Sequence, residues 1–454
     1  MRRAGEPDAA VAGFRHRYRQ LAAGDDGAIR ESEIDPLEEP TSLEDLPVDQ
    51  ASRAPALDRL AVIKINGGLG TSMGLSRAKG IVVVKDGLSF LDIVARQVLA
   101  ARRRHRARLP LVLMNSARTR EDSLAVLDGY PDLPADLPLD FLQGLEPKLR
   151  ADDLRPVSWP ADPALEWCPA GHGDLFVSLL ASGLLEQMLD RGYEYAFISN
   201  TDNLGAVADP RVLAWMEAEQ LDFVSEQCDR TPADRKGGHL ARSRRDRRLL
   251  LRETAQTAAE DQAAMQDITR HRYFHANNIW LRLPALADLL AAGDGVLSLP
   301  LIRNEKTVDP TDPSSPAVYQ LESAVGSAIA LFERAGALRS PRGRFVPVKT
   351  TDDLLTLRSD CFTLDDDARL QISSRRRLAD PPYVELDPDH YKLLDHFEAR
   401  FPSGAPSLAE CERLVVRGEV TFGAEVTVRG SVEIDNAGPA PLRIADGSLL
   451  TGAG

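Results

Sequence analysis

The sequence predicts an α/β protein in which helices cover both faces of a mixed, mostly parallel sheet and a β-rich segment ends the chain. The first observation behind this prediction is an alternation of short apolar, β-branched runs with longer runs of helical period. Residues 61–66 and 111–115 are runs of the first kind, and residues 89–100 and 119–127 are runs of the second kind. Strands that alternate with helices in this way are typical of a parallel sheet covered on both faces.

The second observation is a change in the residue pattern near the C-terminus. Beyond Arg417, short runs of alternating apolar and polar residues are separated by Gly418, Gly423 and Gly430. Three glycine-punctuated units are about the minimum for a stacked solenoid. The pattern therefore predicts the coils of a β-helix or a small β-sheet.

The chain divides into three predicted parts. In residues 1–58, the spacing of Phe14 and Tyr18 predicts a helix, and an acidic, proline-containing stretch after it predicts an extended strap. Residues 59–381 form the main α/β domain. Residues 382–454 form a linker helix and the C-terminal β-helix.

Shorter apolar runs predict the remaining strands of the main domain. These runs are residues 81–85, 195–199, 222–226, 278–282 and 345–348, and residues 240–253 predict a hairpin. Ser89 precedes a helical run, and its hydroxyl can accept a hydrogen bond from the first turn, so we expect it to be the N-cap.

Composition excludes several classes of protein. The formal net charge of −14 argues against non-specific binding to nucleic acid or to anionic membranes. No run approaches the roughly 20 apolar residues of a membrane span, and no secretory signal is visible. The four cysteines are far apart and form no Cys-x-x-Cys pair, so we expect a cytoplasmic protein without a zinc site or disulfides.

Four glycines within eight residues follow the first strand. Gly67, Gly68, Gly70 and Gly74 let a ligand approach the backbone, and Lys79 adds a mobile charge, so the loop predicts phosphate binding. The spacing fits neither a Walker loop nor the dinucleotide fingerprint, whose third glycine would come one residue earlier. By itself the loop is equally compatible with a turn that binds nothing.

Polar residues stand where other predicted strands end. Gln143 can donate and accept hydrogen bonds, as a base edge such as uracil requires, although a surface glutamine has the same signature. His172 lies between Gly171 and Gly173, which brings backbone close to a ligand and leaves the ring to donate to a phosphate. A histidine in a structural turn is the alternative.

A second group of polar residues predicts a metal and a sugar phosphate. Asp202 follows a buried strand among asparagines, and Mg²⁺ prefers one or two carboxylates with waters and phosphates. Asn277 offers an amide to sugar hydroxyls. Lys349, like Lys79, follows a strand, and two such lysines suit an α-phosphate under attack.

Seven motifs then occur in one order, at residues 67–74, 113–116, 171–174, 199–205, 233–238, 276–280 and 345–352. In this order they resemble UTP–glucose-1-phosphate uridylyltransferases of the eukaryotic type, over about residues 60–360. The resemblance implies a nucleotide-diphospho-sugar transferase-like domain at residues 59–381 and a left-handed β-helix at the C-terminus.

The resemblance also implies roles for individual residues. Lys79 and Lys349 match the catalytic lysines, and Asp202 also matches the Mg²⁺ ligand. The nucleotide-binding positions match Asn66, Gly67, Gly68, Gln143, Gly171, Asn200 and Asp202. The positions on the sugar phosphate side match His172, Gly238, Glu253 and Asn277.

The end of the glycine loop departs from the family. Members usually read Gly-Cys-Lys-Gly-Pro-Lys, whereas this chain reads Gly74-Leu-Ser-Arg-Ala-Lys79. Without the proline we expect a less rigid loop. Arg77 either restores the charge of the missing lysine or points to solvent.

The implied activity is Mg²⁺-dependent uridylyl transfer from UTP to glucose 1-phosphate, giving UDP-glucose and pyrophosphate. The alternatives are a pyrophosphorylase for another sugar 1-phosphate, such as N-acetylglucosamine 1-phosphate, and an inactive nucleotide-sugar-binding protein. A dinucleotide-dependent oxidoreductase is disfavoured by the late third glycine and by Asp202. We expect UTP and a sugar 1-phosphate as partners, and self-association through the C-terminal β-helix.

Overall fold

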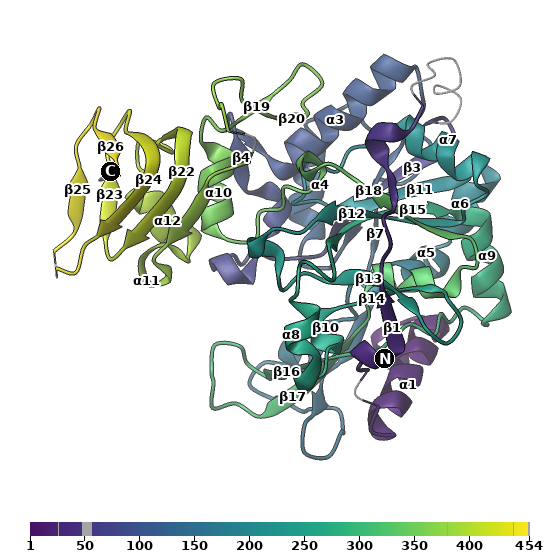
Figure 1. Ribbon diagram of the computed structural model, residues 1–454. Helices are drawn as coiled ribbons and strands as arrows, with labels where there is room; N and C mark the ends of the chain where they lie inside the picture. Colours follow the sequence, from purple (N-terminus) through teal and green to yellow (C-terminus); the bar gives the residue numbers. More distant parts are fainter. Residues whose placement is uncertain (26, 48–56, 379, 439, 453–454) are drawn as a thin grey trace.

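The computed structural model describes residues 1–25, 27–47, 57–378, 380–438 and 440–452 and is built around one eight-stranded sheet (Figure 1). The antiparallel strand β15 lies between β12 and β11, and all other neighbours in the sheet are parallel. In spatial order the strands are β2 (Thr41–Ser42), β18 (Ala335–Arg339), β12 (Phe223–Asp229), β15 (Tyr273–Arg282), β11 (Tyr195–Asn200), β3 (Leu60–Asn66), β6 (Leu111–Asn115) and β7 (Asp140–Leu142).

Both faces of this sheet are buried, as predicted. Along β3, Val62 packs into one hydrophobic cluster, while its neighbours Ala61 and Ile63 pack into another. Continuous apolar runs such as 60–63 are typical of strands covered on both sides. The first face is covered by α3 (Phe90–His105), α7 (Pro210–Ala218) and α10 (Thr351–Arg358), and the second by α5 (Leu175–Ala181), α6 (Leu184–Asp190) and α9 (Leu283–Ala292).

Helix α3 begins where the sequence predicts. The Ser89 hydroxyl accepts a hydrogen bond from the Asp92 backbone at 3.2 Å, and the Asp92 carboxylate accepts one from the Ser89 backbone at 2.9 Å. This reciprocal pair is a capping box. Helix α4 (Arg120–Leu127) follows β6.

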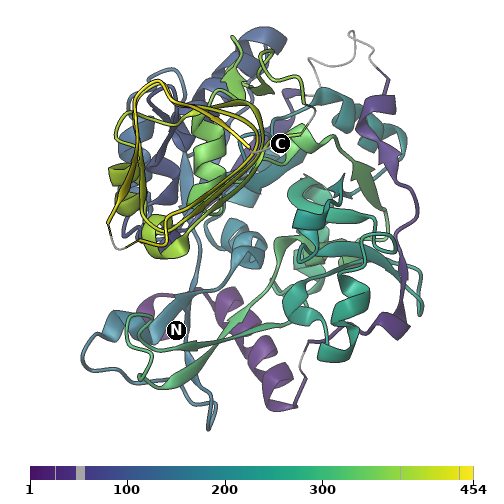
Figure 2. The same ribbon diagram turned by 60° about the vertical axis from the view of Figure 1, so that its left-hand side comes forward.

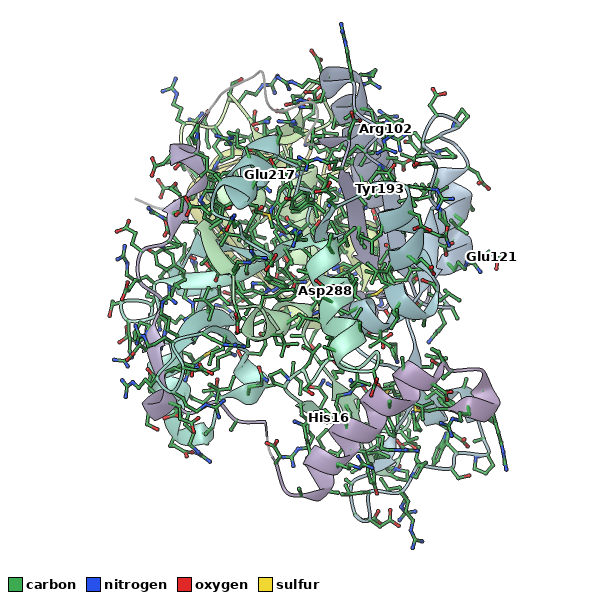
Figure 3. All side chains as sticks on the ribbon, turned by 90° about the vertical axis from the view of Figure 1, so that its right-hand side faces the viewer. His16, Arg102, Glu121, Tyr193, Glu217 and Asp288 are labelled. Atoms are coloured by element: carbon green, nitrogen blue, oxygen red, sulfur yellow. The ribbon has the colours of Figure 1, made fainter. Side chains whose placement is uncertain are left out.

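The N-terminal segment lies beside smaller sheets. Helix α1 (Asp8–Ala22), which carries His16, lies below Asp288 of α9 in Figure 3. Strand β1 (Ile34–Pro36) pairs with β13 (His239–Ser243), which forms the predicted hairpin with β14 (Leu249–Arg252). The other small elements are β4 (Val83–Lys85), β5 (Leu88–Ser89), β8 (Leu145–Pro147), β9 (Leu149–Arg150), β10 (Trp167–Pro169), α8 (Gln262–Met265), β16 (Ile302–Thr307), β17 (Ala317–Glu322), β19 (Phe362–Leu364) and β20 (Leu370–Ile372).

The C-terminal segment is a parallel β-structure, which lies at the left of Figure 1. Strands β21 (Tyr383–Leu386), β22 (Ser407–Arg417), β24 (Thr427–Asp435) and β26 (Leu449–Thr451) form one parallel sheet. Strands β23 (Val420–Phe422) and β25 (Leu442–Ile444) form a second parallel pair. Helices α11 (Pro388–Tyr391) and α12 (Leu394–Arg400) precede β22.

Two strand predictions need correction. Residues 345–348 form no strand, because Pro347 has no N–H to donate and makes only an isolated bridge to Asn203. Within 81–85, a 3₁₀ turn covers Lys79–Ile81 and the strand begins at Val83.

Parts of two other predictions lie outside the described residues. These are residues 48–56 of the predicted strap, and residues 439 and 453–454 of the predicted β-helix. In the part of the chain that the structure describes, no helix has the length and apolarity needed to cross a membrane.

A buried arginine joins the C-terminal sheet to the main domain. Arg376 is 7% exposed, and its guanidinium donates hydrogen bonds to the carbonyls of Leu408, Ala409 and Cys411 at 2.8–3.3 Å. The pairing of β22 with β24 is irregular on both sides of this segment, so these carbonyls need a partner outside the ladder.

We predict that Arg376→Met lowers the free energy of unfolding by about 2–4 kcal/mol, because buried carbonyls lose their charged donor. Chemical denaturation measures the loss. Arg377→Met is the matched control, because Arg377 is exposed and changing it leaves the buried carbonyls paired. Equal stability of the two variants would contradict the role of Arg376.

Candidate active site

The predicted site residues gather at one edge of the central sheet. Asn66 ends β3, Gln143 follows β7 and Asn200 ends β11, so all three lie at the carboxyl ends of parallel strands. Because β15 runs the other way, its first half, with Asn277, reaches the same edge. Ligands of open α/β sheets bind at this edge.

The glycine loop folds back onto Lys79. Gly70 and Gly74 have positive φ angles of 62° and 73°, which favour glycine, and flank a 3₁₀ turn. The Lys79 backbone N–H donates to the Gly68 carbonyl at 3.2 Å. A Cβ on Gly70 would lie 3.3 Å from the Lys79 side chain. The loop therefore holds the stem of Lys79 close to its backbone.

Asn66 anchors this loop from inside. Its amide donates to Asn115 Oδ1 and Ser123 Oγ, both at 2.7 Å, and the residue is buried. A direct ligand contact therefore has to come from its backbone. Next to it, the carboxamide oxygen of Gln143 occupies the space that a Cβ on Gly67 would need.

Lys79 and Asp202 form an ion pair between Nζ and Oδ2. Their side chains are 16% and 20% exposed, so both remain within reach of a ligand. The Asp202 carbonyl accepts a hydrogen bond from the Val348 backbone at 3.3 Å. This bond brings the backbone of Lys349, the next residue, beside the Asp202 loop.

His172 has a defined tautomer. Its Nδ1 accepts a hydrogen bond from the Val325 backbone at 3.0 Å, so the ring proton is on Nε2. Burial lowers the pKa of His172 to about 4, which keeps the ring neutral at neutral pH. Gly171, with φ of 81°, lets the chain pass close to Glu322 and Ser323. His172 is therefore a neutral donor.

Gly238, Glu253 and Lys349 lie close to one another. A Cβ on Gly238 would lie 2.9 Å from Glu253 Oε1, so the carboxylate rests on the glycine backbone. Burial raises the pKa of Glu253, and the positive charge of Lys349 opposes the shift. At the neighbouring strand ends, the Asn277 amide donates to Asn200 Oδ1 at 2.9 Å.

Two other polar residues, which the sequence did not indicate as site residues, hold segments of the candidate site together. Lys64, within the apolar run of β3, donates to Ser199 Oγ at 2.8 Å and to the Ala206 carbonyl at 2.9 Å. Burial lowers its pKa to about 7. Asp174 accepts a hydrogen bond from the Gly144 backbone at 2.7 Å, which ties the His172 turn to the segment after Gln143. A charged residue inside an apolar run is the signal that could have identified Lys64.

Arg77 anchors the departing part of the loop. Its guanidinium contacts both carboxylate oxygens of Asp122, with Nη2–Oδ1 at 2.5 Å, and the Ala78 N–H donates to the same carboxylate at 3.3 Å. The hydrogen bond from Arg77 holds the pKa of Asp122 below its usual range. The Arg77 side chain is 68% exposed, yet its guanidinium is paired with Asp122. It fastens the loop to α4.

Comparisons with known proteins match this chain to one family over most of its length. The model of the UTP–glucose-1-phosphate uridylyltransferase family matches residues 11–429. The uridylyltransferase of that name from Solanum tuberosum is 37% identical over 403 residues, which cover 88% of this chain and 82% of the relative. The Saccharomyces cerevisiae enzyme is 37% identical over 395 residues, covering 87% and 77%.

Solved structures agree as well. UDP-glucose pyrophosphorylase from Leishmania major superimposes with a TM-score of 0.94 at 43% identity, covering 100% of this chain and 97% of that chain. A variant of the same enzyme in complex with UDP-glucose gives a TM-score of 0.93 at 43% identity, covering 100% and 96%. With a family model matched over most of its length, this chain belongs to the UTP–glucose-1-phosphate uridylyltransferase family.

Proposed function

We propose that this protein transfers a uridylyl group from UTP to glucose 1-phosphate, releasing pyrophosphate and UDP-glucose. The observation that carries the proposal is the ion pair of Lys79 with Asp202, which joins the end of the glycine loop to the loop after β11. The chain is similar over most of its length to enzymes named for this reaction, and it carries two lysines and a carboxylate that the reaction can use.

In the proposed complex, the nucleotide lies along the glycine loop. Gln143, beside Gly67, and Gly171 contact the uracil, while Asn66 holds the loop and Gly67 and Gly68 approach the nucleotide with their backbone. Asn200 and Asp202 lie on the phosphate side. Across the site, Gly238, Glu253 and Asn277 receive the hexose, and the neutral His172 donates to its phosphate.

The reaction is an in-line displacement at the α-phosphorus of UTP. A phosphate oxygen of glucose 1-phosphate forms the new P–O bond, and the bond from the α-phosphorus to the bridging oxygen breaks, so pyrophosphate leaves with that electron pair. Little covalent work falls to the protein, and positioning and charge stabilisation dominate. Lys79 and Lys349 neutralise the charge that gathers on the α-phosphate.

A single carboxylate suits the implied Mg²⁺. Among the described residues, no group of three or more His, Cys, Asp or Glu side chains could hold a metal ion by itself. Mg²⁺ commonly takes one or two carboxylates and completes its shell with water and substrate phosphates. Asp202 would therefore hold Mg²⁺ together with the phosphates, and the ion would supply further charge neutralisation there.

We propose the same architecture for the whole chain: an N-terminal helix and strap at residues 1–58, a nucleotidyltransferase domain at 59–381, and a linker helix with a β-helix at 382–454. Successive C-terminal strands stack in parallel, and Figure 2 shows this segment nearly end-on as a closed coil, which supports a β-helix. Exposed Leu449 on its last strand supports self-association there. The four cysteines are unpaired and buried, which supports a cytoplasmic location.

Pyrophosphate release tests the function directly. With Mg²⁺, we expect release from UTP and glucose 1-phosphate, and much less from other nucleoside triphosphates or sugar 1-phosphates. Because the phosphates then lack their shared cation, chelation by EDTA should abolish release, and added Mg²⁺ should restore it. A faster reaction with N-acetylglucosamine 1-phosphate would reassign the sugar, and no release with any pair would favour a binding protein.

Lys79→Ala should lower kcat by about 10²–10³, the usual loss when one charge-stabilising donor is removed from a transition state. The KM values should change far less, because the glycine backbone and Gln143 remain. Lys306→Ala is the matched control, since Lys306 is exposed on β16. Steady-state kinetics measure both variants, and a kcat near that of the wild type would remove Lys79 from catalysis.

Asp122→Ala should raise the KM for UTP by a few-fold while kcat changes little, because the loop loses its anchor on α4. The exposed pair with Arg77 is worth only about 0.2–1 kcal/mol. Arg77→Ala should therefore have a smaller effect than Asp122→Ala, which also removes the acceptor for Ala78. Glu121→Ala is the control, because Glu121 is exposed on the same helix (Figure 3). Equal KM values in all three variants would refute the anchor.

A further inference from the structure

A chain of hydrogen bonds runs from the interior of the sheet to the sugar side of the site. The Gln227 amide donates to Ser225 Oγ at 2.8 Å, and Ser225 Oγ lies 2.9 Å from His275 Nδ1. His275 Nε2 lies 3.2 Å from Asn277 Oδ1, and Asn277 Nδ2 donates to Asn200 Oδ1 at 2.9 Å. The chain thus joins an unassigned histidine to one residue on each side of the proposed site.

The donors and acceptors along the chain fix its direction. Because Ser225 Oγ already accepts from Gln227, its own proton is available for His275 Nδ1. His275 then carries its ring proton on Nε2 and donates to Asn277 Oδ1. The other tautomer would bring two acceptors, Nε2 and Oδ1, within 3.2 Å of each other.

The surroundings hold the ring of His275 in place. The His275 backbone donates to the Gly238 carbonyl at 2.8 Å, and a Cβ on Gly326 would lie 2.5 Å from Nε2, so η11 (Val325–Leu331) packs directly on the imidazole. Burial lowers the pKa of His275 to about 4, and the neighbouring His172 adds to the shift. The ring is therefore neutral at neutral pH.

Local backbone geometry leaves the Asn277 side chain dependent on its hydrogen bond with His275. The pairing of β15 with β12 shifts between Ser225 and Gln227, because residues 276–278 of β15 lie opposite the single residue Glu226 of β12. Within this bulge Asn277 has a φ of 54°, in the left-handed region. Asn277 is therefore left out of the ladder with β12, and its side chain is held by hydrogen bonds with His275 and Asn200.

We propose that His275 is a positioning residue, which orients the Asn277 and Asn200 amides so that both present N–H donors to the nucleotide sugar. Oδ1 of each asparagine is occupied within the chain, and one Asn277 hydrogen is given to Asn200, so the second Asn277 hydrogen and the Asn200 hydrogens are left for the ligand. Such a wall suits acceptor oxygens, as in a hexosyl diphosphate. This inference rests on the proposed function, because the ligand that the two amides would contact is UDP-glucose.

Nitrogen-15 NMR of the histidine-labelled protein tests the hydrogen-bond direction without any ligand. At neutral pH we expect a neutral His275 ring with the proton on Nε2. The spectrum of His275→Gln assigns the signal. In Ser225→Ala the Nδ1 atom loses its hydroxyl donor, so its resonance should shift. A proton on Nδ1 in the wild type would overturn the proposed direction.

Binding of UDP-glucose and UDP to the full chain tests the positioning role, because only UDP-glucose carries the hexose. In His275→Ala we expect the affinity for UDP-glucose to fall about tenfold and that for UDP to fall less than threefold. In His275→Gln the side-chain amide can reach the place of Nε2 and donate to Asn277, so it should recover part of the loss.

Cys361→Ala controls for lost stability, because Cys361 is buried near the C-terminal sheet, away from the site. If the two ligands weaken equally in His275→Ala, or if UDP-glucose binding is unchanged, the positioning role is refuted. A wild-type protein that binds UDP but not UDP-glucose would instead contradict the proposed function. The NMR result would then still decide the direction of the hydrogen bonds.

Discussion

The ion pair of Lys79 with Asp202 is the contact on which the site depends, because it joins two loops that are 123 residues apart in the chain. A buried asparagine holds each loop by hydrogen bonds. Asn66 fixes the glycine loop to Asn115 and Ser123, while Asn203 fixes the Asp202 loop to the Arg344 carbonyl at 3.1 Å. Hydrogen bonds thus hold both members of the pair in place, which is the preorganisation that the proposed stabilisation of a transition state would need.

A buried ion pair lies behind the second loop. Glu226 is fully buried, yet the guanidinium of Arg344, with bonds from Trp280 and Asn278, outweighs the effect of burial and holds its pKa below the usual range. The same Arg344 offers its carbonyl to Asn203 and Asn278. Removing one partner of such a pair would leave an uncompensated charge in the interior. These residues serve the site although they do not face it.

Local patterns made much of the fold and site predictable. The glycine loop, the His172 turn and the Ser89 cap each depend on residues close in sequence, and the alternation of strands and helices indicated a sheet buried on both faces. Contacts that depend on tertiary packing were not predictable. The inward turn of Asn66, the binding of Arg77 to Asp122 and the bulge at Asn277 depend on which elements become neighbours. Pro347 is a further example: the apolar run 345–348 predicted a strand, but proline has no N–H to donate to a neighbouring strand.

The packing of the C-terminal sheet has a thermodynamic consequence. Side chains of β22 and β24, such as Leu414 and Val428, belong to the same buried cluster as Val62 and Phe197 of the central sheet. Separating the two parts would expose apolar surface on both, and a free-energy cost of that kind couples their unfolding. We therefore expect the two parts to melt in one cooperative transition, so that the C-terminal sheet stabilises the central domain and does not unfold independently of it.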